Sequence, residues 1–446
     1  MPREKEPVVL VSVDRGADGS LHEQLERELR DGVRAGRLTP GARLPSSRAL
    51  AQQLGISRGV VIEAYSQLTA EGYLAASQGA PTRVAVGPAV ERPPLPAADF
   101  STRYAYDYNP SLPDLADFPR EAWQRSLRAA TRAAPFDALG YGDPRGTPEL
   151  RNVLMSYLGR ARGAAAEPEH TVVCGGFTQG FGLLCRVLAD RGVERIAVER
   201  PCWPAHRIIA ERAGLEAVDV PVDELGIVVD TLGELEVVVV TPSHQFPTGA
   251  VLAPERRAAL LEWAEDIDGL IVEDDYDSEL RYDRDPVGAL QGLAPERVCQ
   301  IGSASKRLAP GIRLGWLLSP SWLTGALTYE QGVSDAPVLD QLALADFIVR
   351  GELDRHLRRT RLRYRARRAA LLSALAQHLP GLEVAGIAAG IFAPVRLGAG
   401  VAGAAAARGV GLETVGDWVP LGFANLREPA IAEGVRRLAE AAASVS

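Results

Sequence analysis

A proline-rich stretch without helical or strand periodicity divides this chain of 446 residues, and that division is the strongest constraint on its fold. A chain of this length is too long for one compact core. We predict an N-terminal domain over residues 8–87, a semi-rigid connector over 88–117 and a larger domain over 118–446, with a small subdomain from about residue 350. The connector prolines are Pro88, Pro93, Pro94, Pro96, Pro110 and Pro113.

The N-terminal domain has the periodicity of a helix-turn-helix. Apolar residues recur every four positions over 21–35, which predicts an amphipathic helix. A second, short helix is predicted to begin at Ser46 or Ser47, because either side chain can cap it. A third helix is predicted over 58–70, and only about three residues, including a glycine, separate it from the second. We expect residues 78–84 to form a hairpin wing.

In such a domain the third helix would lie in the major groove of double-stranded DNA. Ser57 and Arg58 at its start would face base edges and phosphates, while arginines before and within the second helix would contact the DNA backbone. The residues predicted to contact DNA are Arg43, Ser47, Arg48, Ser57 and Arg58. The alternative is a plain three-helix domain whose arginines are only solvated.

Beyond the connector, β-branched runs alternate with helical segments. The runs at 171–173, 195–198, 237–240 and 270–272 predict buried strands of a mostly parallel α/β sheet. After Pro320 the pattern becomes helical, with a long segment over 351–377 and a final helix over 428–442, which predicts a smaller α+β subdomain. The arginines of the long segment are expected to form a solvated helix face.

Composition narrows the class of protein. A hydrophobic content of 46% is typical of a globular fold. A net charge of −8 does not indicate a nucleic-acid binder, although it can conceal a local DNA-binding module. The four cysteines have no paired close spacing, so we predict neither disulfides nor a metal site. No apolar stretch approaches membrane-spanning length, and we expect a cytoplasmic protein without membrane contact.

Lysine is nearly absent from the chain. Lys5 lies in the charged N-terminal tail and Lys306 lies mid-chain, among 49 lysines and arginines together. Arginine cannot replace lysine where the chemistry needs an amine that loses its proton. The typical role of such an amine is a Schiff base with an aldehyde cofactor. The alternative is an ordinary surface lysine, and the neighbouring residues bear on that choice.

Several residues near Lys306 suit a phosphorylated aldehyde. Arg313, seven positions later, provides the bidentate donor that a phosphate needs. The hydroxyl groups of Ser303 and Ser305 add hydrogen bonds to the same anion. The glycine-containing run 174–180 follows a predicted strand and opens a helix, where backbone N–H groups can approach an anion.

An acidic run and a tryptophan complete the candidate site. Residues 273–277 end a predicted buried strand and include carboxylates that could hold a pyridine nitrogen protonated, as an electron-sink cofactor requires. The alternatives for this run are a solvated acidic loop or a magnesium site. Trp203 would stack on the cofactor ring, and the alternative is a core tryptophan.

The run from Arg43 to Leu74 closely resembles the winged helix-turn-helix of the GntR superfamily, although the wing reads Gly79-Ala80-Pro81-Thr82 instead of the usual glycine–any–glycine–threonine. The later motifs resemble fold-type I aminotransferases that use pyridoxal phosphate. Together they make the chain similar to the MocR/GabR family of transcriptional regulators over nearly its whole length. The motifs lie at 141–146, 241–249, 273–280, 303–316 and 421–426.

This resemblance implies an α/β protein: a winged helix-turn-helix followed by an aminotransferase-like large domain and a small α+β C-terminal subdomain. It implies that Lys306 forms an internal aldimine with pyridoxal 5'-phosphate, that one carboxylate pairs with the pyridine nitrogen, and that an aromatic residue stacks on the ring. The cofactor residues that it implies are Lys306, Asp274, Tyr276, Trp203, Gly176, Phe177, Thr178, Ser303, Ser305 and Arg313. Asp274 is assigned to the pyridine nitrogen, with Asp275 as the alternative.

The implied function is a DNA-binding transcriptional regulator that senses pyridoxal phosphate or an amine through Lys306, as a head-to-tail homodimer on operator DNA. Pro420 stands where amino-acid-binding relatives place a carboxylate-binding arginine, so transamination of a common amino acid is not expected. Arg207 could replace that anchor. Two alternatives remain: a working aminotransferase with a residual DNA-binding head, and a DNA-binding protein whose large domain is only a dimerisation scaffold.

Overall fold

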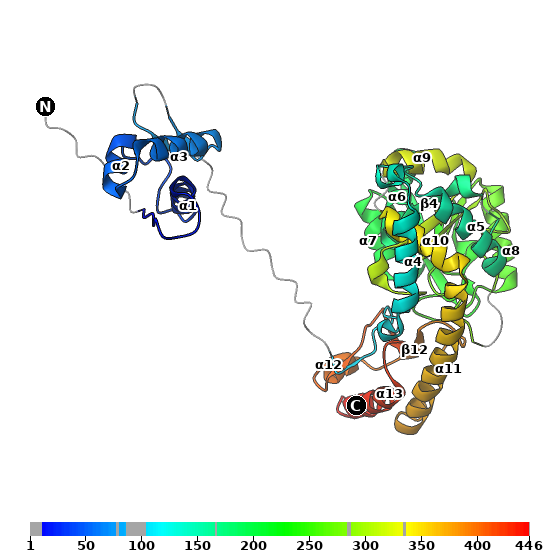
Figure 1. The fold of residues 1–446 in the computed structure, drawn as a ribbon. Helices are drawn as coiled ribbons and strands as arrows, with labels where there is room; N and C mark the ends of the chain where they lie inside the picture. Colours follow the sequence, from blue (N-terminus) through cyan, green and yellow to red (C-terminus); the bar gives the residue numbers. More distant parts are fainter. Residues whose placement is uncertain are drawn as a thin grey trace. The chain divides into compact units, whose positions relative to one another are not determined.

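The computed structural model describes residues 11–76, 80–85, 104–165, 167–282, 287–332 and 336–445. The chain forms two compact units, residues 1–99 and 100–446, which are considered separately below (Figure 1). The connector prolines before Pro110 and Gly79 of the wing lie outside the described residues.

The first unit packs three helices against a two-stranded antiparallel sheet. Glu23 accepts a hydrogen bond from the Ser20 N–H at 2.8 Å, which fixes the start of the first helix. Ser46, not Ser47, caps the second helix, which ends at Gly55 in the left-handed conformation. Ser57 caps the third helix by accepting from the Val60 N–H. The elements are α1 (Leu21–Arg34), α2 (Ser47–Leu54), α3 (Arg58–Ala70), β1 (Leu74–Ala75) and β2 (Arg83–Val84).

An eight-stranded mixed sheet forms the centre of the second unit, in the order β4-β11-β10-β9-β8-β5-β6-β7. The pairs formed by β10, β9, β8, β5 and β6 are parallel, while β11 runs antiparallel to both of its neighbours. The predicted α/β class is confirmed. The strands are β4 (Thr171–Cys174), β5 (Arg195–Arg200), β6 (Glu216–Asp223), β7 (Gly226–Ile227), β8 (Val237–Val240), β9 (Leu270–Asp275), β10 (Val298–Ser303) and β11 (Gly315–Leu318).

Helices cover both faces of this sheet (Figure 1). On one face α6 (Phe177–Asp190), α7 (Pro204–Arg212) and α9 (Ser321–Gln331) pack on Val172 and Val272. On the other face α8 (Pro254–Asp266) packs on Ile271, and the helices α5 and α10 pack on Val173. Successive strand residues point to opposite faces, so both layers can be apolar. The bounds of the remaining helices here are α4 (Arg120–Ala133), α5 (Pro148–Arg162) and α10 (Val338–Val349).

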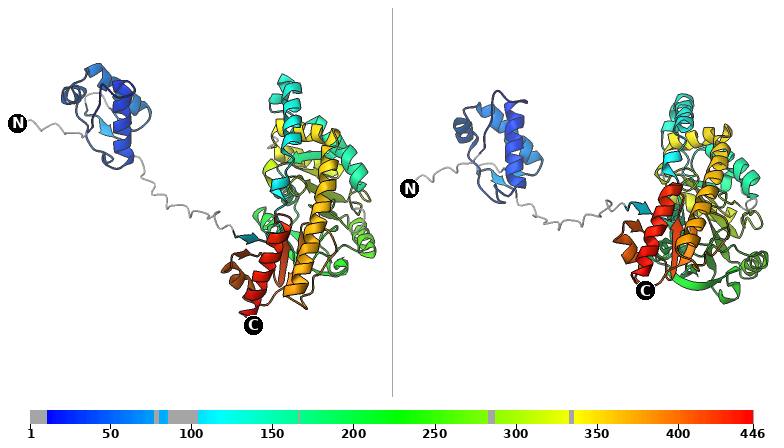
Figure 2. Two further views of the ribbon diagram at one scale, coloured as in Figure 1. Left: turned by 60° about the horizontal axis from the view of Figure 1, so that its bottom comes forward. Right: turned by 90° about the horizontal axis from the view of Figure 1, so that it is seen from below.

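The small subdomain places α11 and α13 side by side against the antiparallel pair β12–β14 (Figure 2). The short strand β3 (Tyr106–Asp107), which follows the connector prolines, pairs in parallel with β13. Residues 104–117 are therefore packed on the second unit. The elements are α11 (Glu352–His378), β12 (Phe392–Arg396), α12 (Val401–Ala406), β13 (Val410–Gly411), β14 (Trp418–Gly422) and α13 (Glu428–Ala443).

Arg355, Arg358, Arg359 and Arg365 of α11 are exposed as expected, but two other arginines of this helix turn away from the solvated face. Arg367 is only 6% exposed and contacts Asp114 Oδ2 at 2.8 Å, and Arg363 contacts the same carboxylate at 3.5 Å. These contacts join α11 to the segment that follows β3. Within the described ranges, no helix combines the length and the apolar character needed to cross a membrane. Short 3₁₀ helices lie at Leu115–Asp117, Phe136–Leu139, Pro168–His170, Val229–Thr231 and Pro310–Ile312.

The core of the first unit is small, so a single truncation should unfold it selectively. Leu29 is fully buried there, and Leu29→Ala should lower the free energy of unfolding of this unit by about 2–5 kcal/mol. Urea denaturation followed by circular dichroism should show this early transition moved to lower urea, with the transition of the second unit unchanged. Ile62→Ala, at a site that is 48% exposed, is the control. An unmoved early transition in Leu29→Ala would contradict the assignment of this core.

Candidate functional site

A cavity of about 220 Å³ opens in the second unit at the carboxyl ends of its central strands. Asp274 comes from the end of β9, and Lys306 follows the end of β10. Phe177 lies at the turn from β4 into α6, and Trp203 lies at the turn from β5 into α7. Strand ends of this kind are where α/β sheets bind ligands. The sheet topology thus brings together residues that are far apart in the sequence.

One end of the cavity suits a phosphate. Arg313 lines it, and within the described residues its guanidinium makes no hydrogen bond or ion pair. Gly176 has a φ of 106°, which favours glycine, and a Cβ there would lie 3.8 Å from Arg313 Nη1 and 3.9 Å from Ser303 Oγ. Ser303 Oγ and Ser305 Oγ lie 2.8 Å apart at the same end. An unpaired guanidinium beside hydroxyl groups and open backbone fits a bound anion.

The amine of Lys306 lies inside the cavity. Burial lowers the pKa of Lys306, and the carboxylates of Asp274, Asp277 and Glu413 oppose that effect. Its Nζ donates a hydrogen bond to the Ser111 carbonyl oxygen at 2.7 Å. A lowered pKa increases the fraction of neutral amine, which is the form that attacks an aldehyde.

Asp274 and Asp275 point into different surroundings. Asp274 lines the cavity, and its Oδ2 lies 3.0 Å from His206 Nε2. Burial raises the pKa of Asp274, and the hydrogen bond with His206 counteracts this. Burial would lower the pKa of His206, but its hydrogen bonds to Asp274 and Cys202 raise it to about 9. A carboxylate backed by a protonated imidazole suits a positively charged ring nitrogen.

Aromatic side chains form the walls between these two ends. Trp203 and Phe177 line the cavity with their ring centroids 5.9 Å apart. Tyr276 also lines it and donates its hydroxyl hydrogen to the His244 carbonyl oxygen at 2.5 Å. Burial raises the pKa of Tyr276 well above its ordinary value, so the phenol stays protonated. Thr178 lies at the edge of the same cavity.

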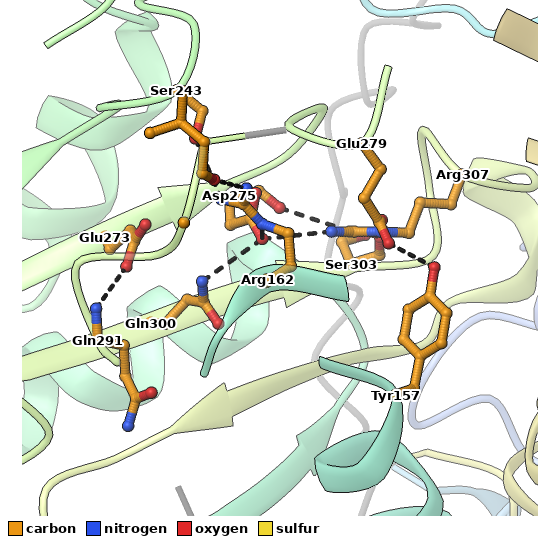
Figure 3. A network of polar contacts seen from close by, with 12 residues as sticks. Tyr157, Arg162, Ser243, Glu273, Asp275, Glu279, Gln291, Gln300, Ser303 and Arg307 are labelled. Carbon is orange, nitrogen blue, oxygen red and sulfur yellow. Dashed lines mark hydrogen bonds and ion pairs between the residues drawn. The ribbon is translucent and has the colours of Figure 1, made fainter. Parts of the chain in front are cut away.

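A buried network of charged side chains includes Asp275, the neighbour of the cavity-lining Asp274 (Figure 3). Asp275 Oδ2 lies 3.4 Å from Arg162 Nε and 3.3 Å from Arg307 Nη2. Arg307 also pairs with Glu279 and donates to the Ser303 carbonyl oxygen at 2.7 Å. Burial would raise the pKa of Asp275, but the two guanidinium groups hold it below its ordinary value. The network ties the ends of β9 and β10 to α5.

Sequence reasoning missed several residues that line the cavity. His206 lies three positions after Trp203, the N-cap residue of α7, so the first turn of this helix brings the two side chains together, and that spacing could have revealed His206. Pro110, Ser111, Thr241, Phe246 and Pro310 also line the cavity. No local signal marks Pro110 and Ser111, because they reach the cavity only through the pairing of β3 with β13.

The residues predicted to contact DNA lie around α2 and α3 of the first unit. Arg43, Arg48, Ser57 and Arg58 are exposed, and Ser47 is half-buried. Arg58 Nε donates to Ser47 Oγ at 3.2 Å, so the starts of the two helices are joined. Such a pair of helices with exposed arginines has the form of a DNA-reading module.

Fold and site together define a two-part protein: a helix-turn-helix unit and an α/β unit with the site of a phosphate-bearing aldehyde cofactor. Residues 21–84 match the gntR family of bacterial regulatory proteins, and residues 112–408 match the aminotransferase class I and II family. A crystal structure of Pyrococcus horikoshii kynurenine aminotransferase aligns with 76% of this chain and 91% of its own, with a TM-score of 0.69 and 27% identity.

Two relatives share both parts. The HTH-type pyridoxine biosynthesis transcriptional regulator PdxR of Corynebacterium glutamicum is 37% identical over 84% of this chain and 83% of its own. The probable rhizopine catabolism regulatory protein MocR of Rhizobium meliloti is 34% identical over 83% of this chain and 80% of its own. This chain belongs to the MocR-type transcriptional regulators, which join a GntR helix-turn-helix to a class I and II aminotransferase domain. Pyridoxal phosphate is the cofactor of that domain, and DNA is the ligand of the helix-turn-helix.

Glu273 should make the stability of the second unit depend on pH. Burial and the nearby Asp275 raise the pKa of Glu273 from 4.5 to about 7. The folded protein binds the proton of the Glu273 carboxyl group more tightly than the unfolded chain does, so protonation of Glu273 stabilises the fold. This stabilisation is complete below pH 4.5 and is lost as the pH rises through 7. Glu273→Gln should flatten this decline in thermal denaturation between pH 4.5 and 8, whereas the exposed Glu265→Gln should not. The same slope in Glu273→Gln and the parent would contradict the burial of this charge.

Proposed function

We propose that this regulator senses pyridoxal phosphate, or an amine that reacts with it, through Lys306. The observation that carries the proposal is the position of the buried Lys306 amine in one cavity with an unpaired Arg313 and the imidazole-backed Asp274. When bound, pyridoxal phosphate supplies an aldehyde that condenses with primary amines and a ring that withdraws electrons. Lys306 would attach the aldehyde carbon, and Asp274 would hold the proton on the ring nitrogen.

The other predicted residues would orient the cofactor. Arg313, Ser303 and Ser305 would bind the phosphate, together with the backbone of Gly176, Phe177 and Thr178 at the start of α6. Trp203 would cover one face of the ring, and the Tyr276 hydroxyl would turn from the His244 carbonyl oxygen to donate to the phenolic oxygen of the cofactor. His206 would keep Asp274 ionised by sharing its own proton with that carboxylate.

The absence of a second anion anchor supports a sensor role over common transamination. Pro420 lies in β14 opposite Pro394, is buried and offers no side-chain donor. Arg207 is paired with Asp219 and Glu211, so it does not supply the missing anchor. Among the described residues that line the cavity, the side chains with a permanent or readily acquired positive charge are Lys306, Arg313 and His206. Arg313 would be used by the phosphate, so an amino-acid carboxylate would have no guanidinium to bind.

A working aminotransferase is the second candidate, because the fold matches enzymes of that class and the cofactor residues lie together. Incubation with a panel of amino acids and an acceptor keto acid separates the two functions. Multiple turnover would favour the enzyme, while single half-reactions favour the sensor.

The protein would act in the cytoplasm as a head-to-tail homodimer. In this dimer the helix-turn-helix unit of each chain would pack on the large domain of the other chain. Domains of this aminotransferase type are typically dimeric. Exposed apolar residues on the second unit support such an interface: Phe136 is 97% exposed and Tyr141 is 88% exposed. Two readers would then contact paired half-sites of an operator.

Replacement of Lys306 should abolish covalent cofactor attachment. The purified parent should show a visible absorption band with pyridoxal phosphate, and borohydride reduction should leave the cofactor mass on the peptide that contains Lys306. Lys306→Ala should lack both signals while its thermal stability stays close to that of the parent. An adduct on another residue, or no adduct in the parent, would contradict the proposal.

Removal of the Arg58 guanidinium should weaken operator binding. Loss of one base or phosphate contact costs about 1–3 kcal/mol, so Arg58→Ala should raise the Kd for the upstream DNA about tenfold or more in electrophoretic shifts. Cofactor uptake should be unchanged. Arg27→Ala, which removes an exposed charge from α1, is the matched control and should have a smaller effect. Equal affinity of Arg58→Ala and the parent would place the DNA contact elsewhere.

A further inference from the structure

The C-terminal part of the connector, from residue 104 onward, is a segment that forms part of the wall of the cofactor cavity. Pro110 and Ser111 line the cavity from this segment. The Ser111 carbonyl oxygen accepts a hydrogen bond from Lys306 Nζ at 2.7 Å, although 195 residues separate the two in sequence. The residue expected to react with the cofactor therefore contacts the chain on its way from the DNA-binding unit.

Backbone hydrogen bonds hold the beginning of this segment on the small subdomain. The Tyr106 N–H donates to the Gly409 carbonyl oxygen and the Tyr108 N–H donates to that of Gly411, each at 3.0 Å. The Tyr108 hydroxyl, in a fully buried side chain, donates to the Ile431 carbonyl oxygen at 2.6 Å. A shift of this strand must break or move these bonds, so residues 106–108 anchor the connector on the small subdomain.

The far end of the segment is held on α11. The Asp114 N–H donates to the Tyr364 hydroxyl oxygen at 2.8 Å, and Arg367 Nη2 donates to Asp114 Oδ2 at 2.8 Å. Residues 109–113 bridge these two anchors, and the contact from Lys306 falls within this bridge. We call residues 109–113 the cavity bridge.

We propose that the cavity bridge reports the chemical state of Lys306 to the connector. A free lysine amine has hydrogens to donate to the Ser111 carbonyl oxygen. When the neutral amine condenses with an aldehyde, a C=N bond forms, and both amine hydrogens leave with the aldehyde oxygen as water. Any proton that the imine nitrogen later takes up would be accepted by the neighbouring phenolic oxygen of the cofactor, so no N–H remains for Ser111. An incoming primary amine that takes over the C=N bond transfers two hydrogens to Lys306, which can donate again.

The two states of Lys306 therefore differ by one hydrogen bond to the cavity bridge. Ser111 lies in the C-terminal part of the predicted connector, between β3 and α4, so a change in the bridge acts directly on the hydrogen-bonded residues 106–108 that hold the connector on the second unit. A ligand that changes the state of Lys306 shifts the populations of the two arrangements, and this is the requirement for coupling between two sites. The inference rests on the proposed attachment of the cofactor to Lys306.

Hydrogen–deuterium exchange of the full-length holoprotein tests this coupling. Hydroxylamine is the probe, because its amine takes the cofactor aldehyde carbon as an oxime and frees Lys306. Peptides that cover residues 104–114 should exchange about tenfold more slowly after hydroxylamine. The reason is that the freed Lys306 amine donates a hydrogen bond to the Ser111 carbonyl oxygen again and so stabilises the cavity bridge. Unchanged exchange, with loss of the absorption band showing that the lysine was freed, would overturn the inference.

Two further measurements keep the outcomes distinct. Lys306→Ala loaded with pyridoxal phosphate is the matched control: its exchange over 104–114 should be the same with and without hydroxylamine. If hydroxylamine slows exchange equally in this variant, the effect comes from the oxime and the coupling through Lys306 is wrong. If the parent shows no band and no adduct on Lys306, the proposed function fails before the coupling is tested.

Tyr364→Phe tests the transmission, since it removes the acceptor of the Asp114 N–H without changing a cofactor-binding residue. This variant should keep the absorption band and its loss with hydroxylamine. The hydroxylamine-dependent change in operator affinity should fall at least threefold relative to the parent. If hydroxylamine changes the operator affinity of Tyr364→Phe as much as that of the parent, transmission through the cavity bridge is contradicted.

Discussion

The cofactor cavity depends on the burial of Asp275 between two arginines. Arg162 reaches it from α5 at 3.4 Å and Arg307 reaches it from the turn after β10 at 3.3 Å. Removal of one partner of a buried pair typically costs about 3–5 kcal/mol, because the remaining charge stays buried without compensation. With Asp275 held on one side of β9, strand alternation directs Asp274 to the other side, where the cavity lies. Arg307 is turned inward by the same contacts, while its neighbour Lys306 lines the cavity.

The charges of the cavity suit a bound cofactor better than a range of amino acids. The unpaired Arg313 lies beside Gly176 and Ser303, and Asp274 has a protonated imidazole behind it. Under the proposed function, both ends of pyridoxal phosphate would find partners of opposite charge. A substrate carboxylate would find none at Pro420, which is paired with Pro394 and offers no side-chain donor. A domain of this kind would be suited to report on small molecules to an attached DNA reader.

Much of the site could be predicted because its chemistry requires particular residue types at short spacing. Lys306 and Arg313 lie seven positions apart, and the glycine-containing turn before α6 is contiguous, so the pattern is visible in one dimension. His206 and Ser111 could not be found in the same way. His206 acts through Asp274, which is 68 residues away, and the carbonyl group of Ser111 carries no side-chain signature. The arginines of α11 look solvated in sequence, yet Arg367 is buried because Asp114 folds back onto it.

The sequence by itself indicated the family, through the resemblance of its motifs. It also indicated the helix-turn-helix and the reactive amine candidate, which follow from local periodicity, capping residues and the scarcity of lysine. The tertiary structure decided which of two adjacent aspartates lines the cavity, which serine caps α2, and what the Lys306 amine contacts. These outcomes depend on groups brought together from distant parts of the chain, and on which charges are buried with partners. A local pattern specifies the residues that can interact, whereas only the packed chain specifies the distances between them.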